Sequence, residues 1–123
     1  MVTILVHNVD EAILEIISSI LTSSGYQCRS AATAATTLNI LNGNERIDLV
    51  LCGHEWTDED FKLMRATFSN VPVVLCTSMH NTRERSHFTG LGACDTLLLP
   101  FTREELKAIV SRALDSTAEG RSG

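Results

Sequence analysis

Basic residues are scarce in this sequence, and acidic residues outnumber them. The 123 residues include 10 Lys and Arg against 15 Asp and Glu, which gives a formal net charge of −5. Surfaces that bind nucleic acids or anionic membranes need a basic face, so we expect this domain to bind neither. No apolar run approaches the roughly 20 residues of a membrane span. The chain start lacks the basic region and cleavage site of a signal peptide, so we expect a cytoplasmic protein.

Closely spaced cysteine pairs are also missing. Four cysteines are present, and no two of them form a CxxC pair. A chain of this length with 44% hydrophobic residues can form one full core without disulfides. We therefore expect a single domain with free thiols, and we exclude disordered and fibrous classes of protein.

The sequence does contain an alternation of strand-like and helix-like periodicity. Apolar runs at residues 2–6, 47–52, 71–76 and 94–99, with a weaker one at 26–30, predict strands. The segments between them carry apolar residues three and four positions apart, as amphipathic helices do. Such alternation predicts an α/β domain with a parallel sheet and helices on both faces.

Ligands of such folds bind at the carboxyl ends of the strands. In this chain that edge would be lined by residues 6–10, 52–57, 77–81 and 98–102. Thr57 and Thr102 each have an acidic residue three positions later, the spacing of a capping box, so each marks a helix start. Residues 116–123 are rich in Ser, Gly and charge, and predict a flexible tail or the start of a linker after a domain at 1–115.

Several segments resemble the receiver domain of bacterial response regulators. They are Ile4 to Val6 with Ala12 to Glu15, Asp48 to Leu51, Val71 to Thr77, and Gly92 to Leu106. The resemblance implies a flavodoxin-like (βα)5 fold, a doubly wound parallel sheet of five strands in the order 2-1-3-4-5. It also implies two-component signalling, in which a partner histidine kinase phosphorylates an aspartate with the help of Mg²⁺.

The residues that carry this chemistry in the family are mostly replaced here. The acidic pair that holds Mg²⁺ falls on Asn8 and Val9, the phospho-accepting aspartate on Gly53, the phosphate-binding Thr or Ser on Thr77, the lysine on Leu99, and the switch aromatic on Thr96. Only Thr77 matches its role. Each lost charge pair at about 4 Å is worth on the order of 4 kcal/mol at an effective dielectric constant near 20. We therefore predict a degenerate receiver that binds no Mg²⁺ or other cofactor and has no catalytic residues.

Histidine and cysteine residues are also predicted at the carboxyl edge of the sheet. His7, His54 and His80 fall at predicted strand ends or loops, with Cys52 and Cys76 just below them. Together they would suit Zn²⁺, but none of them has close ligand spacing. We expect the two cysteines to face one helix layer as small apolar side chains.

Two further residues in the loop after the third strand leave alternatives open. Glu55 would supply a permanent negative charge near Gly53, or lie in a solvated loop. Trp56 is the one tryptophan of the chain. It would either plug the former phosphate pocket or anchor a partner, since tryptophan is enriched at binding hot spots.

The leading hypothesis is an interaction module that works without phosphorylation. In the family, the fourth helix, fifth strand and fifth helix form a face that docks partners or a second copy of the chain. That face would span about 82–114 here, with the polar candidates Arg83, Arg85, His87, Arg103 and Lys107. The alternative is a metal or small-ligand sensor that reuses the former pocket. We expect a protein partner, a signalling protein or an output domain, and no enzymatic activity.

Overall fold

Five parallel strands and five helices alternate along the chain. The computed structural model describes residues 2–8, 10–53, 56–78 and 82–122. The elements are β1 Thr3–His7, α1 Glu11–Ser23, β2 Gln27–Ala31, α2 Ala34–Leu41, β3 Leu49–Gly53, α3 Asp58–Thr67, β4 Val73–Ser78, α4 Thr82–Gly90, β5 Asp95–Leu99 and α5 Arg103–Ser122. The sheet order is β2-β1-β3-β4-β5, and every neighbouring pair is parallel. The predicted doubly wound α/β fold is therefore confirmed.

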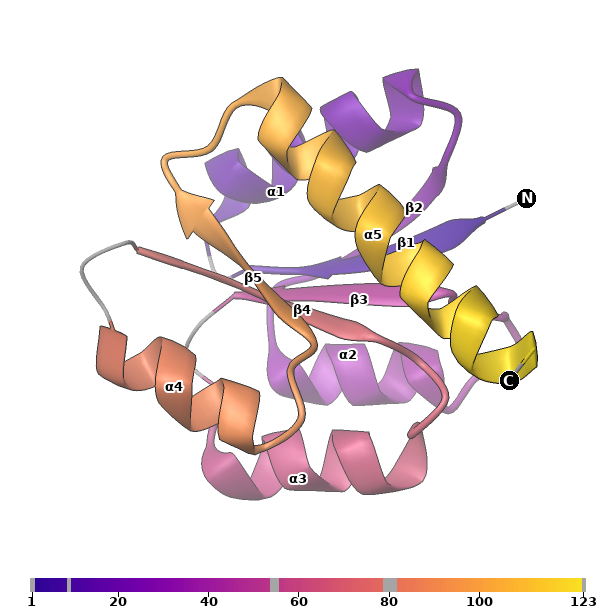
Figure 1. Ribbon diagram of the computed structural model, residues 1–123, viewed down its shortest axis with the longest axis vertical. Helices are drawn as coiled ribbons and strands as arrows, with labels where there is room; N and C mark the ends of the chain where they lie inside the picture. Colours follow the sequence, from indigo (N-terminus) through magenta and orange to yellow (C-terminus); the bar gives the residue numbers. More distant parts are fainter. Residues whose placement is uncertain (1, 9, 54–55, 79–81, 123) are drawn as a thin grey trace.

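The helices cover both faces of this sheet (Figure 1). Helices α1 and α5 pack on one face over a core that includes Ile4, Leu51 and Leu97. Helices α2, α3 and α4 lie on the other face, where Phe61 and Phe88 belong to a second core. Strands buried on both sides account for the continuous apolar runs of the sequence.

Side-chain caps fix where the helices near the carboxyl edge begin. The Asp10 carboxylate accepts the Ala12 N–H at 2.9 Å at the start of α1. The Thr102 hydroxyl accepts the Glu105 N–H at 3.1 Å, and the Glu105 carboxylate accepts the Thr102 N–H at 3.2 Å. The Thr57 hydroxyl caps α3 by accepting the Asp60 N–H at 3.1 Å. Both predicted capping sites are confirmed, and they satisfy N–H groups that a helix leaves unpaired.

The expectation for Cys52 and Cys76 is wrong. Cys52 belongs to the core under α2, α3 and α4, whereas Cys76 belongs to the core under α1 and α5. The reason is the register, because β3 pairs with β4 so that Gly53, and not Cys52, lies opposite Cys76. Side chains alternate between faces along a strand, so an offset of one residue separates the two thiols. Burial raises the pKa of the Cys76 thiol to about 11.

Helix α5 continues through Ser122, where the composition led us to expect a frayed tail. A Ser-rich and charged composition indicates exposure to solvent, and an exposed segment can still extend a helix that is already nucleated. The division between a domain at 1–115 and a following linker stays a prediction. Within the described part of the chain, no helix combines the length and apolar character needed to cross a membrane.

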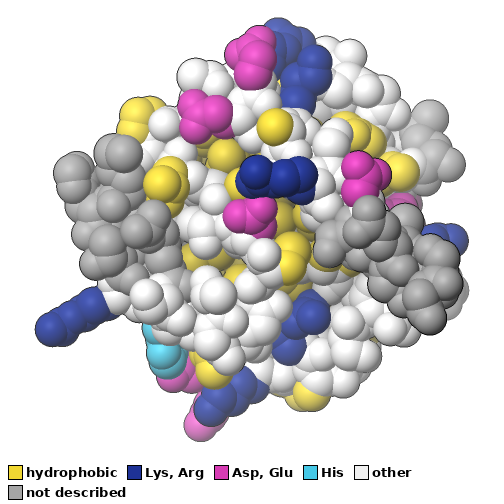
Figure 2. Space-filling view, viewed as in Figure 1, with side chains coloured by type: hydrophobic (Ala, Val, Ile, Leu, Met, Phe, Trp, Pro, Cys, Tyr) yellow, Lys and Arg dark blue, Asp and Glu magenta, His cyan; other side chains and the backbone are white. Residues whose placement is uncertain are grey.

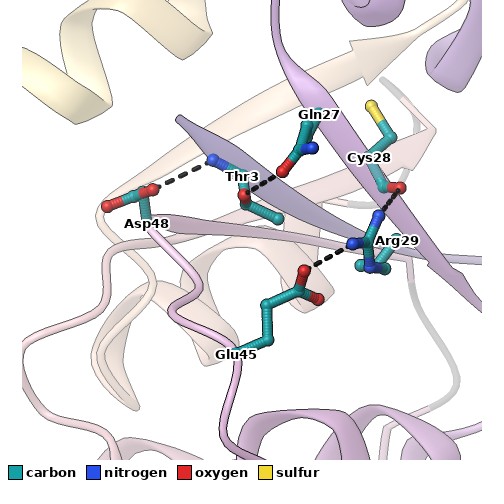
Figure 3. A network of polar contacts seen from close by, with 6 residues as sticks. All are labelled: Thr3, Gln27, Cys28, Arg29, Glu45 and Asp48. Carbon is teal, nitrogen blue, oxygen red and sulfur yellow. Dashed lines mark hydrogen bonds and ion pairs between the residues drawn. The ribbon is translucent and has the colours of Figure 1, made fainter. Parts of the chain in front are cut away.

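A polar network joins the strands at the amino edge of the sheet (Figure 3). The Thr3 N–H donates to Asp48 Oδ2 at 2.9 Å, and the Thr3 hydroxyl donates to Gln27 Oε1 at 3.1 Å. Arg29 and Glu45 form an ion pair at 2.5 Å beside them. These contacts tie β1, β2 and the segment before β3 together at the edge opposite the predicted site.

Candidate functional site

The carboxyl edge of the sheet brings together two of the residues predicted for a phosphorylation site. His7 at the end of β1 lies opposite Cys52 in register, so Asn8, which follows β1, lies beside Gly53, the last residue of β3. Asn8 is buried, and its Oδ1 accepts the Asp10 N–H at 2.9 Å. This bond holds the Asn8 amide in place as the chain turns from β1 into α1.

The amide of Asn8 takes the space in which a side chain at Gly53 would begin. A Cβ atom built on Gly53 would lie 3.0 Å from Asn8 Nδ2 and 3.2 Å from Asn8 Cγ. Contacts under about 3.4 Å require a neighbour to move, and Asn8 is held by its bond to Asp10. In this conformation, position 53 has neither a side chain nor free room for one.

His7 fills the space beneath these two residues. Its side chain is buried, and its Nδ1 accepts both the Gly53 N–H at 3.2 Å and the Trp56 indole N–H at 3.0 Å. Because both partners are obligatory donors, Nδ1 must be unprotonated. This network assigns the tautomer, in which the proton of neutral imidazole lies on Nε2.

Trp56 closes the site from the loop between β3 and α3. It is 5% exposed, and its ring meets His7 edge to face at a centroid distance of 5.4 Å. Its other contact is with Phe61 of α3 at 6.2 Å, and Phe61 in turn lies 4.9 Å from Phe88 of α4. Of the two interpretations of Trp56, its burial supports the plug over the exposed anchor.

The described residues do not fit a magnesium site. Mg²⁺ is held through carboxylate oxygens at octahedral geometry. Asn8 offers an amide whose oxygen is already bonded, and the Asp10 carboxylate caps α1 through the N–H groups of Ala12 and Ile13. Gly53 contributes no side chain, so an octahedral oxygen set is not assembled from these groups.

Four other residues predicted for the site are not among those that the structure describes. Val9, His54, Glu55 and His80 lie outside the described residues. Over the described ranges, no group of three or more His, Cys, Asp or Glu side chains is arranged to hold a metal ion. Thr77 is buried in β4.

The residues predicted at the lysine and aromatic positions lie on β5. Leu99 ends β5 and packs against the core under α1 and α5. Thr96 faces a hollow that it lines with Ser86, Thr89 and Gly90 of α4. A short side chain at this position leaves the space between β5 and α4 unfilled.

Some side chains of the predicted interaction face are exposed, and others are bonded to neighbouring helices of the same domain. Arg83 and Lys107 are exposed, and the side chain of Arg85 lies outside the description. His87 Nε2 lies 2.7 Å from Asp58 Oδ1 of α3, and Arg103 donates to the Ser23 hydroxyl at the end of α1 at 2.7 Å. Figure 2 shows this side of the molecule with Lys, Arg, Asp and Glu interspersed among apolar side chains.

Sequence reasoning missed three contacts between the elements. It did not find the Asp58 partner of His87, the ion pair between Arg112 and Asp95 at 3.0 Å, or the aromatic contact of Phe61 with Phe88. Each joins residues that are distant in the sequence. The one available signal is the spacing of Phe61 and Met64, three residues apart, which is typical of one face of a helix.

Comparisons with known proteins match this architecture. The sequence fits the family described as the response regulator receiver domain over residues 4–111. The two-component response regulator ORR24 of rice, Oryza sativa subspecies indica and japonica, is 31% identical over 104 residues. That match covers 81% of this chain and 17% of the rice protein, so the chain spans less than a fifth of the length of these curated relatives.

Solved structures share the fold at lower identity. NtrX from Brucella abortus is similar with a TM-score of 0.92 and 22% identity, over 99% of this chain and 29% of that one. A CheY-like response regulator receiver domain protein from Methanospirillum hungatei JF-1 is similar with a TM-score of 0.88 and 22% identity, over 98% of both chains. With the family match, these likenesses show that the chain belongs to the response regulator receiver domains of two-component signalling.

Proposed function

We propose that this receiver domain accepts no phosphoryl group and acts as a protein-interaction module whose docking is independent of phosphorylation. The observation that carries the proposal is the Asn8 amide 3.0 Å from where a Cβ of residue 53 would lie. Phosphoryl transfer needs a nucleophile at this position, and glycine provides none. The protein is proposed to be cytoplasmic and without enzymatic activity.

The surroundings of Gly53 support the same conclusion. The negative charge that develops on a transferred phosphoryl group is stabilised by a metal ion and a cationic side chain. Asn8 stands where a carboxylate would bind the metal, and Leu99 packs into an apolar core where a lysine would bind the phosphate. The buried contact between His7 and Trp56 further closes the site from the side of α3.

A thermal-shift titration with Mg²⁺, and with Mg²⁺ plus beryllofluoride, tests the loss of phosphorylation. A ligand at about 100 times its Kd stabilises a protein by roughly 2.7 kcal/mol, which is about 5–15 °C in Tm for a domain of this size. We expect no shift here, and a clear shift for a control receiver that carries the acidic pair, the aspartate and the lysine. A shift with Mg²⁺ and beryllofluoride would show a working site and refute the proposal. A third titration with Zn²⁺ tests the sensor alternative.

The docking face is tested separately by charge reversal. Arg83 and Lys107 are exposed on α4 and α5, so Arg83→Glu with Lys107→Glu changes this face without removing a described contact. We expect the double variant to weaken self-association or partner binding in sedimentation velocity. Lys62→Glu on the exposed side of α3 is the matched control. Equal association of wild type, double variant and control would show that docking uses another surface.

A further inference from the structure

His7 is a titratable side chain enclosed in the protein, and the proposed function makes no use of its chemistry. It is 2% exposed, and two N–H donors from β3 and the following loop converge on one ring nitrogen. A neutral imidazole satisfies both donors. A protonated imidazole would turn Nδ1 into a third donor that faces them, so neither bond could form.

The groups around His7 determine how such a proton would act. Its neighbours in register are Ala31 on β2 and Cys52 on β3. The thiol of Cys52 is the titratable group that the strands place beside it. At the start of α1 the Asp10 carboxylate is turned to the Ala12 N–H. On α3 and α4, Asp58 and His87 contact each other on the exposed side of these helices.

We propose that the contact between His7 and Trp56 is a pH-sensitive latch over the former phosphorylation site. Protonation of His7 at Nδ1 breaks the bonds to the Trp56 indole and the Gly53 N–H, and Trp56 then leaves its buried position. The latch is closed with a neutral histidine and opens as the pH falls through the ordinary range of imidazole.

Opening of the latch reaches α4 through aromatic contacts. Trp56 packs on Phe61, and Phe61 packs on Phe88 of α4. Release of Trp56 removes one side of this stack and loosens α4, which belongs to the proposed docking face. This last step rests on the proposed function, whereas the latch itself can be measured without any partner.

The size of the effect follows from the two protonation states. An imidazole that is exposed to water has a usual pKa of about 6.5. The closed state accommodates only the neutral form of His7. The equilibrium constant for closing the latch therefore falls roughly tenfold between pH 7.5 and pH 5.5. The stabilisation is fully present above this range and is lost as the pH decreases, because the open state binds the additional proton.

Tryptophan fluorescence reports on the environment of Trp56 alone, because it is the one tryptophan of the chain. We would measure acrylamide quenching of its emission between pH 7.5 and pH 5.5. In wild type we expect the acrylamide quenching constant of Trp56 to rise by up to about tenfold as the pH falls. His7→Gln keeps an acceptor that cannot titrate, so its quenching should not change with pH. The matched control His87→Gln removes an exposed histidine and should follow wild type.

Equal pH dependence in wild type and His7→Gln, or no pH dependence in wild type, would overturn the latch. If His7→Gln does not fold, NMR of the wild type tests the same proposal. The protection factor of the single indole N–H, which corrects for the intrinsic pH dependence of exchange with water, should be about tenfold lower at pH 5.5, and the His7 nitrogen shifts should show an unprotonated Nδ1 at pH 7.5. A protonated Nδ1 at pH 7.5 would contradict the proposal. Neither measurement involves a partner, so failure of the latch would leave the docking proposal standing.

Discussion

The two edges of the sheet use opposite kinds of chemistry to hold the strands together. At the amino edge, Asp48 accepts the Thr3 N–H and also pairs with Arg46 at 3.0 Å, with Arg29 and Glu45 alongside. At the carboxyl edge, a neutral histidine, an asparagine and a tryptophan surround Gly53. Charges stabilise the edge where no ligand chemistry is expected, and neutral groups close the edge where the fold places its ligand sites.

This contrast shows what a receiver domain needs for its fold alone. The ion pairs at the amino edge are partly solvated, so they stabilise the strands without a fully buried charge. Carboxylates clustered at the carboxyl edge would repel one another unless a cation bound there. Replacing them by groups that bond to one another removes that repulsion. The carboxyl edge can thus become part of the core.

The largest expected effect comes from opening the carboxyl edge. Trp56→Ala removes a buried indole that contacts His7 and Phe61, and substitutions of this kind cost about 3–5 kcal/mol of unfolding free energy. Urea unfolding followed by circular dichroism measures the change. Leu63→Ala on α3, where the side chain is 54% exposed, should stay within about 0.5 kcal/mol of wild type. Similar stabilities for the two variants would mean that Trp56 is not packed in solution.

A smaller effect is expected from adding one methyl group at the same edge. Gly53→Ala places a Cβ against the Asn8 amide, and overpacking of this kind costs about 1–3 kcal/mol. Gly90→Ala is the matched control, because a Cβ there meets no atom within 4 Å. Thermal unfolding should show a lower Tm for the first variant and an unchanged or higher Tm for the second. Equal Tm values would mean that Asn8 moves aside freely.

The smallest expected effect is at the amino edge, but two contacts there should differ. Asp48→Ala leaves the Thr3 N–H without its acceptor, which costs about 1–3 kcal/mol because the Asp48 side chain is only 15% exposed. Glu45→Gln breaks an ion pair whose side chains are 42% and 35% exposed, and should cost at most about 1 kcal/mol. Salt at 1 M should remove most of the second effect and little of the first. A larger loss for Glu45→Gln than for Asp48→Ala would reverse this ranking.

The fold followed from the sequence because its signals are local. Apolar runs, helical stripes and the caps at Thr57 and Thr102 all depend on residues a few positions apart. For the site, the sequence predicted which positions belong to it but not which side chains contact one another. That Asn8 lies against Gly53, and that His7 bonds to Trp56, depends on the register of β1 with β3 and on a loop conformation. The error over Cys52 had the same origin, since an offset of one residue between strands changes which face a side chain occupies.

The close approach of Asn8 to position 53 also has a consequence for how this domain can evolve. A single mutation that restored an aspartate at 53 would set its Cβ against the Asn8 amide, held in turn by its bond to Asp10. The Asn8 amide would have to shift by a few tenths of an ångström to admit that side chain. Which residue can stand at position 53 therefore depends on how freely the side chain at position 8 moves, so the two positions are expected to constrain each other.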